Sequence, residues 1–321
     1  MKIRSILLTS TAVLFCTASI SAATIEHTWV SGTGSDSNPC TFASPCLTFT
    51  GALANTSAGG MITAKDAGDF GAVSIGKSVT IDGNNVGNIT FASGNGINIT
   101  SSANVTVQNL TINGLGSAAY GIYDGSGGTV IVDHCRISFT NIGIDFGGAG
   151  NLTVENTRID SLVGSSHFGI HIEATAAENV VVRNTVIDAS PLAANNCGIV
   201  VESNAGPVKA SLQKVTIMGA GNDAVFVATG VLEITNSVIT QSVTGIDAYS
   251  GSTVSVASSL ITANTNGVIF GAGAKVRLDN NDIYDNTTAI SGSGTVKTST
   301  TNKTSGTIAI PASDVSNSVT F

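Results

Sequence analysis

An eight-residue pattern of alternating apolar and polar positions returns along most of this chain. It reads VTVQNLTI at residues 105–112, LTVENTRI at 152–159 and LEITNSVI at 232–239. Copies begin at Val105, Val130, Leu152, Val180, Ala210, Leu232, Val254 and Val276. Successive copies are 22 residues apart in four cases and at most 30 apart. Self-similarity at this period predicts a solenoid, in which each repeat buries its apolar face against its neighbours.

A second mark, a Gly-Ile-like pair, recurs between the copies. Its first residue is Gly96, Gly121, Gly143, Gly169, Gly198, Ala224, Gly245, Gly267 or Ala289. Each repeat therefore holds three short strands: one at this pair, one at the V-x-V segment and one that ends in Ile. Alternate positions in each strand are apolar, which turns one face inward and the other outward. Three strands and no helix in about 22 residues predict an all-β, single-stranded, right-handed parallel β-helix.

Two columns of the repeat are predicted to be structural. The last position forms a core column of Ile112, Ile137, Ile159, Ile187, Ile217, Ile239, Ile261 and Ile283. The fifth position forms a corner of Asn109, His134, Asn156, Asn184, Lys214, Asn236, Ser258 and Asn280. Asn tolerates the left-handed backbone conformation at such a corner. Stacked side-chain amides can also bond to one another along the axis.

Composition and charge then narrow the classes of ligand. The chain has 321 residues with 37 Gly, only 11% charged side chains and a formal net charge of −8. An acidic protein attracts neither nucleic acid nor anionic membrane surfaces. The charge permits a neutral ligand or one bridged by calcium. We therefore expect a polysaccharide or cell-surface glycan as partner, no nucleic acid and no required cofactor; the sequence does not indicate an oligomeric state.

The N-terminal residues predict export. Lys2 and Arg4 precede an apolar run that is too short to span a bilayer, and small residues follow at 21–23. This pattern is typical of a cleaved signal peptide, here residues 1–23, and it predicts a secreted or periplasmic protein. No other run is apolar enough to span a membrane.

Four cysteines follow the predicted signal peptide. In an oxidising compartment the spacing of Cys40 and Cys46, within NPCTFASPC, predicts a local disulfide. Cys135 and Cys197 fall at different phases of the repeat, so we expect two separate buried thiols.

With this repeat, the sequence resembles the pectate-lyase-like superfamily of parallel β-helix proteins over roughly residues 48–290. Its opening segment, TWVSGTGSDSNPC at 28–40 followed by LTFTGALANTSAG at 47–59, is similar to the start of many secreted β-helix proteins. The resemblance implies a short helix that caps the open end. It divides the chain into an N-terminal segment with cap helix (24–60), the β-helix (61–295) and a degenerate last rung with a tail (296–321).

The resemblance implies a fold rather than an activity, because the superfamily includes lyases, polygalacturonases, tailspikes, adhesins and proteins with no known reaction. The polygalacturonase elements N-T-D, D-D, G-H-G and R-x-K are not matched. The segment NTR at 156–158 lacks the Asp, and HFG at 167–169 lacks the preceding Gly. Hydrolysis by that mechanism is therefore not expected, and no stretch matches a lyase motif.

The two longest repeats are consecutive, and their extra length flanks the first strand. Long loops on one side of a regular solenoid usually form the walls of a groove. Alternation from the Gly-Ile pair turns a stripe of side chains outward there. Its candidate ligand-binding residues are Tyr123, Asp145, His171, Glu173, Glu202, Asp247 and Tyr249.

Each residue type in this stripe suggests a role. Tyr123 and Tyr249 would offer ring faces to sugars. The carboxylates of Asp145, Glu173 and Glu202 would bond hydroxyl groups or hold calcium.

For catalysis, His171 together with His167 would transfer a proton, with Glu173 and Asp145 as further candidates. The alternative interpretation is a set of solvated outward positions.

The sequence thus favours a protein that binds carbohydrate or surface ligands through this groove. Two alternatives stay open: a polysaccharide lyase that acts by β-elimination, and a structural or adhesive surface protein.

Overall fold

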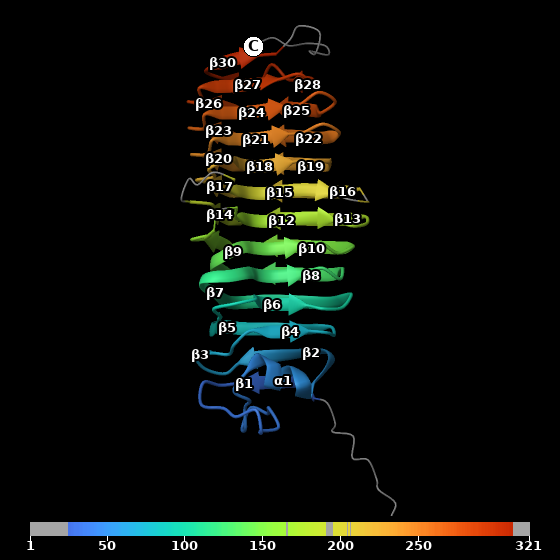
Figure 1. Ribbon diagram of the computed structural model, residues 1–321, viewed down its shortest axis with the longest axis vertical. Coiled ribbons are helices and arrows are strands. Elements are labelled where there is room, and N and C mark those ends of the chain that lie inside the picture. The colour runs from blue at the N-terminus through green and yellow to red at the C-terminus, as the bar shows by residue number, and fades with distance from the viewer. Residues whose placement is uncertain (1–24, 165, 191–194, 204, 206, 311–321) are drawn as a thin grey trace, which may run out of the picture.

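The computed structural model describes residues 25–164, 166–190, 195–203, 205 and 207–310. The predicted signal peptide, the tail from residue 311, and parts of the two long loops (191–194, 204 and 206) lie outside the described residues. Nearly all described secondary structure is β-strand, wound into a solenoid of about 11 turns (Figure 1). The predicted single-stranded, right-handed parallel β-helix is confirmed.

Three parallel sheets form the walls of the solenoid. The first sheet contains β4 (Val73–Ile75), β6 (Asn95–Ile99), the end of β7 (Ala103–Asp124), the end of β9 (Arg136–Phe146), β12 (Phe168–Ala174), β15 (Cys197–Ser203), β18 (Asp223–Val227), β21 (Thr244–Ala248), β24 (Asn266–Phe270), β27 (Thr288–Gly292) and β30 (Thr307–Ala309). The second contains β1 (Ile25–Val30), β2 (Thr56–Ala64), the start of β5 (Val79–Thr90), the start of β7, β8 (Gly128–Asp133), β10 (Gly150–Glu155), β13 (Glu178–Arg183), β16 (Val208–Gln213), β19 (Gly230–Thr235), β22 (Ser252–Ala257), β25 (Lys275–Asp279) and β28 (Thr295–Thr298). The third contains β3 (Gly68–Asp69), the end of β5, the middle of β7, the start of β9, β11 (Arg158–Asp160), β14 (Val186–Asp188), β17 (Thr216–Met218), β20 (Val238–Thr240), β23 (Leu260–Thr262), β26 (Asp282–Tyr284) and β29 (Lys303–Thr304).

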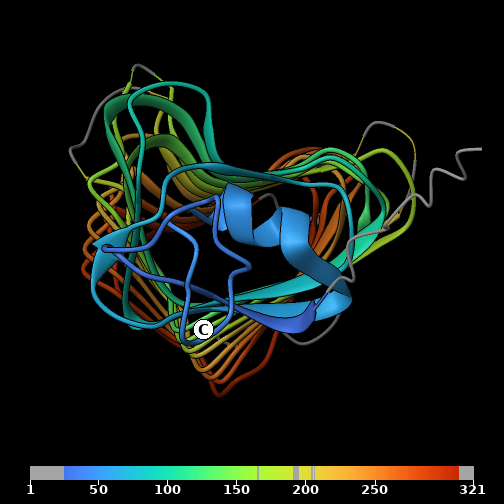
Figure 2. The same ribbon diagram turned by 90° about the horizontal axis from the view of Figure 1, so that it is seen from below.

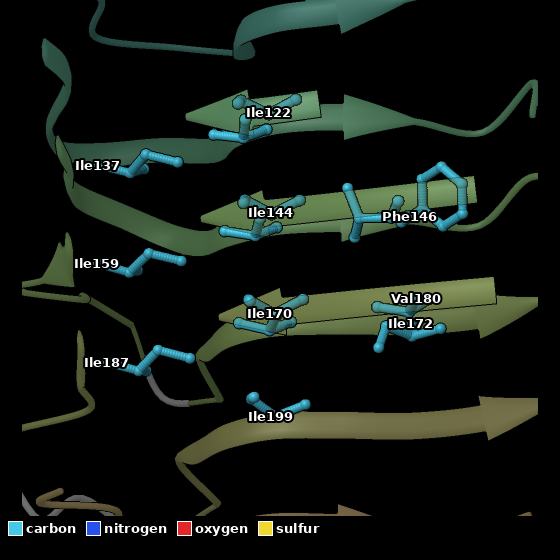
Figure 3. Packing of buried hydrophobic residues seen from close by; sticks show 14 of the residues in the cluster. Ile122, Ile137, Ile144, Phe146, Ile159, Ile170, Ile172, Val180, Ile187 and Ile199 are labelled. Atoms are coloured by element: carbon cyan, nitrogen blue, oxygen red, sulfur yellow. The ribbon is translucent and has the colours of Figure 1, made fainter. Parts of the chain in front are cut away.

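The core is a stack of aliphatic columns along the axis. Ile137, Ile159 and Ile187 lie one above another in Figure 3, and strand pairing joins them in register. All eight members of the predicted Ile column are at most 1% exposed. Burying each such side chain contributes about 1.5–3 kcal/mol, so the column holds neighbouring rungs together.

The recurring glycine of the Gly-Ile pair is explained by this column. A Cβ atom on Gly121 would lie 2.4 Å from the Cγ2 atom of Ile137 and 2.6 Å from the carbonyl oxygen of Gly143. The backbone here approaches both the core column and the next rung too closely for a side chain. A very small residue at this position, Gly in seven of the nine copies and Ala in the other two, is therefore a packing requirement.

The corner residues behave as predicted in their backbone. All eight have positive φ, from 49° at Asn184 to 54° at Asn109. Some side chains also bond along the axis, as when the Asn156 amide donates to Asp133 Oδ1 at 2.8 Å.

A longer ladder of hydrogen bonds along the axis is formed by the sixth position of the repeat, directly after the corner residue. The backbone N–H of Ser237 donates to Ser259 Oγ, that of Ser259 to Asn281 Oδ1, and that of Asn281 to Asn302 Oδ1. These side chains accept bonds from corner amides that the strand ladders leave unpaired.

The N-terminal end is covered by helix α1 (Phe49–Asn55), which lies across the solenoid in the end-on view of Figure 2. Thr48 caps it, since its Oγ accepts from the Gly51 N–H at 2.9 Å. The buried face of the helix consists of its own residues Phe49, Ala52 and Leu53. The short cap helix of the predicted fold is thus present.

The cysteines are arranged as predicted. Cys40 and Cys46 form a disulfide in the loop before α1. Cys135 and Cys197 are free, separate and buried. Among the described residues, no helix has the length and apolar character needed to cross a membrane.

Candidate functional site

The outer face of the first sheet carries one column of candidate residues in register. Strand pairing places its members on successive rungs in the order Tyr123, Asp145, His171, Val200, Phe226 and Asp247. Glu173 and Glu202 pair with each other two positions further along their strands. Residues up to 124 positions apart in the chain (247 − 123) therefore share one strip of surface.

His171 is the centre of this strip. Its Nδ1 lies 3.1 Å from Asp145 Oδ1, and its Nε2 lies 3.0 Å from Glu202 Oε1. The side chains of His171 and Asp145 are only 12% and 9% exposed, whereas that of Glu202 is 38% exposed. The ring is thus held between one enclosed and one solvated carboxylate.

This arrangement sets the charge of the ring. Burial by itself would lower the pKa of His171, but the hydrogen bonds to Asp145 and Glu202 outweigh it and raise the pKa to about 8. At neutral pH the ring is therefore mostly protonated, and both nitrogens donate.

The surroundings of the ring remain acidic. Burial and then the charge of Asp145 raise the pKa of Tyr120. Counting Asp145, Glu173 and Glu202 against one imidazolium leaves a net formal charge of −2 (−3 + 1) on this cluster.

A groove of roughly 240 Å³ opens beside His171. Phe168, Val200 and Phe226 supply its apolar surface, and Glu202 and Asp223 supply carboxyl groups. The rings of Phe168 and His171 lie 5.3 Å apart, and those of Phe226 and Tyr249 lie 6.3 Å apart. The groove thus combines an aromatic wall with ionisable groups.

Asp223 is a second group that titrates near neutrality. Burial, and then the neighbouring charge of Asp247, raise its pKa to about 7, although the Thr244 hydroxyl opposes the shift. Burial raises the pKa of Asp247 as well. Perturbed groups facing one cavity are typical of functional sites. His171 and Asp223 are therefore candidates for proton exchange with a bound ligand.

Other sequence-predicted residues lie apart from this groove. His167 is buried, with Nδ1 3.3 Å from the Gly164 carbonyl and Nε2 3.4 Å from the Ala189 carbonyl, and it does not line the groove. Tyr123 stacks on Tyr120 at 5.2 Å on the N-terminal side. Tyr249 is 59% exposed beside Phe226.

Alternation along the strand did not reveal Tyr120, Phe168 and Asp223. Each of them directly precedes a Gly-Ile-like pair. Both residues of that pair face the core, so side chains on either side of it point outward, and Tyr120 can stack on Tyr123. The position directly before each Gly-Ile-like pair could therefore have identified these three residues from the sequence.

Within the ranges that the structure describes, no three His, Cys, Asp or Glu side chains are grouped so as to hold a metal ion.

Comparison with known proteins identifies the fold. The family model described as "right handed beta helix region" matches residues 61–209 and 197–320. No protein of curated function matches the sequence significantly.

Solved structures with a similar fold are distant in sequence. The GH136 lacto-N-biosidase from Eubacterium ramulus aligns with a TM-score of 0.53 at 11% identity, over 89% of this chain and 67% of that chain. Pectate lyase Pel9A gives 0.48 at 12% identity, over 93% and 80%. The periplasmic alginate epimerase AlgG gives 0.49 at 11% identity, over 74% and 65%. At such identities the similarity extends to the fold alone.

Proposed function

This chain belongs to the right-handed β-helix family, and on that premise we propose that it binds a neutral carbohydrate in the groove beside His171. The observation that carries the proposal is the pairing of an aromatic wall with hydrogen-bonding groups in one groove. Phe168 and Phe226 offer apolar surface to the C–H faces of a sugar, while Glu202 and Asp223 can bond its hydroxyl groups. The export signal predicted at residues 1–23 supports binding outside the cytoplasm.

The charge of the cluster supports a neutral rather than an acidic ligand. His171 is already bonded to two carboxylates, so it has no N–H left for an anionic group. The net negative surroundings would repel a carboxylate on a sugar. Hydroxyl groups, in contrast, can both donate to Glu202 and accept from a protonated Asp223.

Calorimetric titration of the purified protein with a panel of neutral oligosaccharides tests the proposal. We expect Phe226→Ala to weaken binding about tenfold, since the loss of an aromatic contact of 1–1.5 kcal/mol has that effect. Phe139, which is 41% exposed and lies outside the groove, provides the matched control Phe139→Ala. The proposal is refuted if no neutral oligosaccharide binds, or if both variants bind equally well.

Catalysis is a second candidate function, favoured by two groups in one groove that titrate near pH 7–8. In a polysaccharide lyase His171 or Asp223 would exchange a proton with the sugar during β-elimination. Incubation with neutral and acidic polysaccharides would then release new reducing ends together with an unsaturated product. We expect His171→Gln to abolish release, with His27→Gln, on β1, as the control; no release from any substrate leaves binding alone.

A further inference from the structure

A second, larger groove lies on a different wall of the solenoid. It has a volume of roughly 530 Å³ and is formed by β19, β22, β25 and β28 of the second sheet, toward the C-terminal end (Figure 1). Val231, Val254 and Val276 line it together with hydroxyl side chains such as Ser255. It contains none of the residues of the groove beside His171.

Three cations gather in this groove, although the chain is acidic. Lys275, Arg277 and Lys297 all line it, and each is exposed. In the part of the chain that the structure describes, no ion pair or side-chain hydrogen bond joins any of them to another residue. By contrast, Arg136, Arg158 and Arg183 on the middle rungs are all paired with carboxylates.

The register brings two of these cations face to face. Arg277 on β25 is directly opposite Lys297 on β28, at the spacing of about 4.8 Å between neighbouring strands. Like charges in this position are destabilising. Lys275 lies two residues before Arg277 on the same face of the strand. The local repulsion would be relieved by an anion bound between them.

The acids nearby do not neutralise the cluster. Glu233 lines the groove but lies two rungs from Arg277, with Ser255 between them. Asp279, further along β25, accepts a hydrogen bond from the Thr301 hydroxyl at 3.2 Å. Three cations against Glu233 leave a net formal charge of +2 (3 − 1) in the groove, within a chain of net charge −8.

We propose that this groove binds a polyanionic polysaccharide, laid along the helix axis across successive rungs. Stacked strands repeat their side chains at about 4.8 Å, so Arg277 and Lys297 can contact neighbouring anionic groups of one chain. The guanidinium of Arg277 suits bidentate contact with a carboxylate or sulfate group. Val231, which is 41% exposed, offers apolar surface to a sugar ring, whereas Val254 and Val276 face the core. Single-stranded nucleic acid is disfavoured because no aromatic side chain among the described residues lines the groove for its bases to stack on.

Dextran sulfate and its uncharged twin dextran are the probes for this proposal. Binding to the full chain is measured by fluorescence anisotropy at low and at high ionic strength. We expect dextran sulfate to bind and salt to weaken its binding, whereas salt should leave any binding of uncharged dextran unchanged. We expect Arg277→Gln with Lys297→Gln to weaken binding by tenfold or more, as loss of about 1.4 kcal/mol requires. The double variant should fold at least as stably as the wild type, because it removes a like-charge contact.

Lys214→Asn, singly and combined with Lys65→Gln near the N-terminal end, is the matched control. It removes cations outside the groove, and Lys214 stands at the left-handed corner where the repeat usually has Asn. The proposal is overturned if dextran sulfate does not bind, if the control variants lose as much affinity, or if the double variant weakens the binding of dextran as much as that of dextran sulfate. Equal affinity for single-stranded DNA would also overturn it, since the groove would then select charge and not a glycan. His171→Gln should leave this binding unchanged.

Discussion

The rungs that carry β12, β15 and β18 differ from those that carry β21, β24 and β27, although one core runs through both. In the later rungs the chain repeats every 22 residues, and buried Ser and Asn side chains bond from rung to rung at the corners. In the earlier rungs two successive repeats lengthen to 28 and 30 residues, and the half-buried His171 and the buried Asp223 face a groove. Regular spacing allows identical polar side chains to stack, whereas inserted residues interrupt the stack and leave room for a ligand.

The largest expected effect tests whether both regions share one core. Ile261→Ala in the regular rungs should lower the free energy of unfolding by about 3 kcal/mol, because it removes buried methyl groups and leaves a cavity. Ile187→Ala in the longer rungs should cost about as much, since both side chains are fully buried. Urea unfolding measures both. A cost at Ile187 of less than half that at Ile261 would show that the longer rungs are less tightly packed.

The second largest effect is a pH dependence of the free energy of unfolding, which we expect from the longer rungs because they contain His171. The folded-state pKa of His171, about 8, lies above the ordinary value of 6.5, so its contribution is fully present below pH 6.5 and is lost as pH rises through 8. The shift corresponds to about 2 kcal/mol. Urea unfolding of the wild type and of His171→Gln between pH 6 and 9 measures the difference.

Other buried acids also make the free energy of unfolding fall as pH rises. Because the wild type and His171→Gln share these acids, the difference between their pH profiles isolates the contribution of His171. Ionisation of Asp223, whose pKa is about 7, destabilises the folded protein as pH rises. Ionisation of Glu178, which is buried near Asp124 and has a pKa of about 8, does the same. Glu178→Gln is the reference variant, because it removes one of these other acids and leaves the ion pairs of His171 intact. Identical pH profiles for the wild type and His171→Gln would contradict the proposed ion-pair network.

The smallest of the three effects concerns the ladder of the regular rungs. Asn281 is fully buried, accepts from the Ser259 N–H and donates to the Val256 carbonyl. Asn281→Ala leaves these groups without a partner and should cost about 1–2 kcal/mol. Asn151→Ala, at an exposed position on β10, should cost less than about 0.5 kcal/mol. Equal losses in thermal unfolding would show that the ladder adds nothing beyond surface hydrogen bonding.

The candidate site was only partly predictable. Alternation placed Asp145, His171 and Glu202 on one outward strip, because the Gly-Ile pair marks the start of each strand. It could not find Phe168 or Asp223, since two successive residues of the pair face inward and the alternation fails there. The proximity of His167 to His171 in the sequence was misleading about space: His167 turns inward to backbone carbonyls.

The sequence by itself determined the solenoid, its Ile column, its left-handed corners and the Cys40–Cys46 disulfide. These features repeat or are local, so each copy of the pattern reinforces the same interpretation. Only the tertiary structure decided that Asp145 and Glu202 hold His171 between them, and that Arg277 faces Lys297. Such contacts depend on the register between rungs. The Gly-Ile pairs align the rungs, as Ile144, Ile170 and Ile199 show, but only packing in space decides which outward side chains turn toward one another across that register.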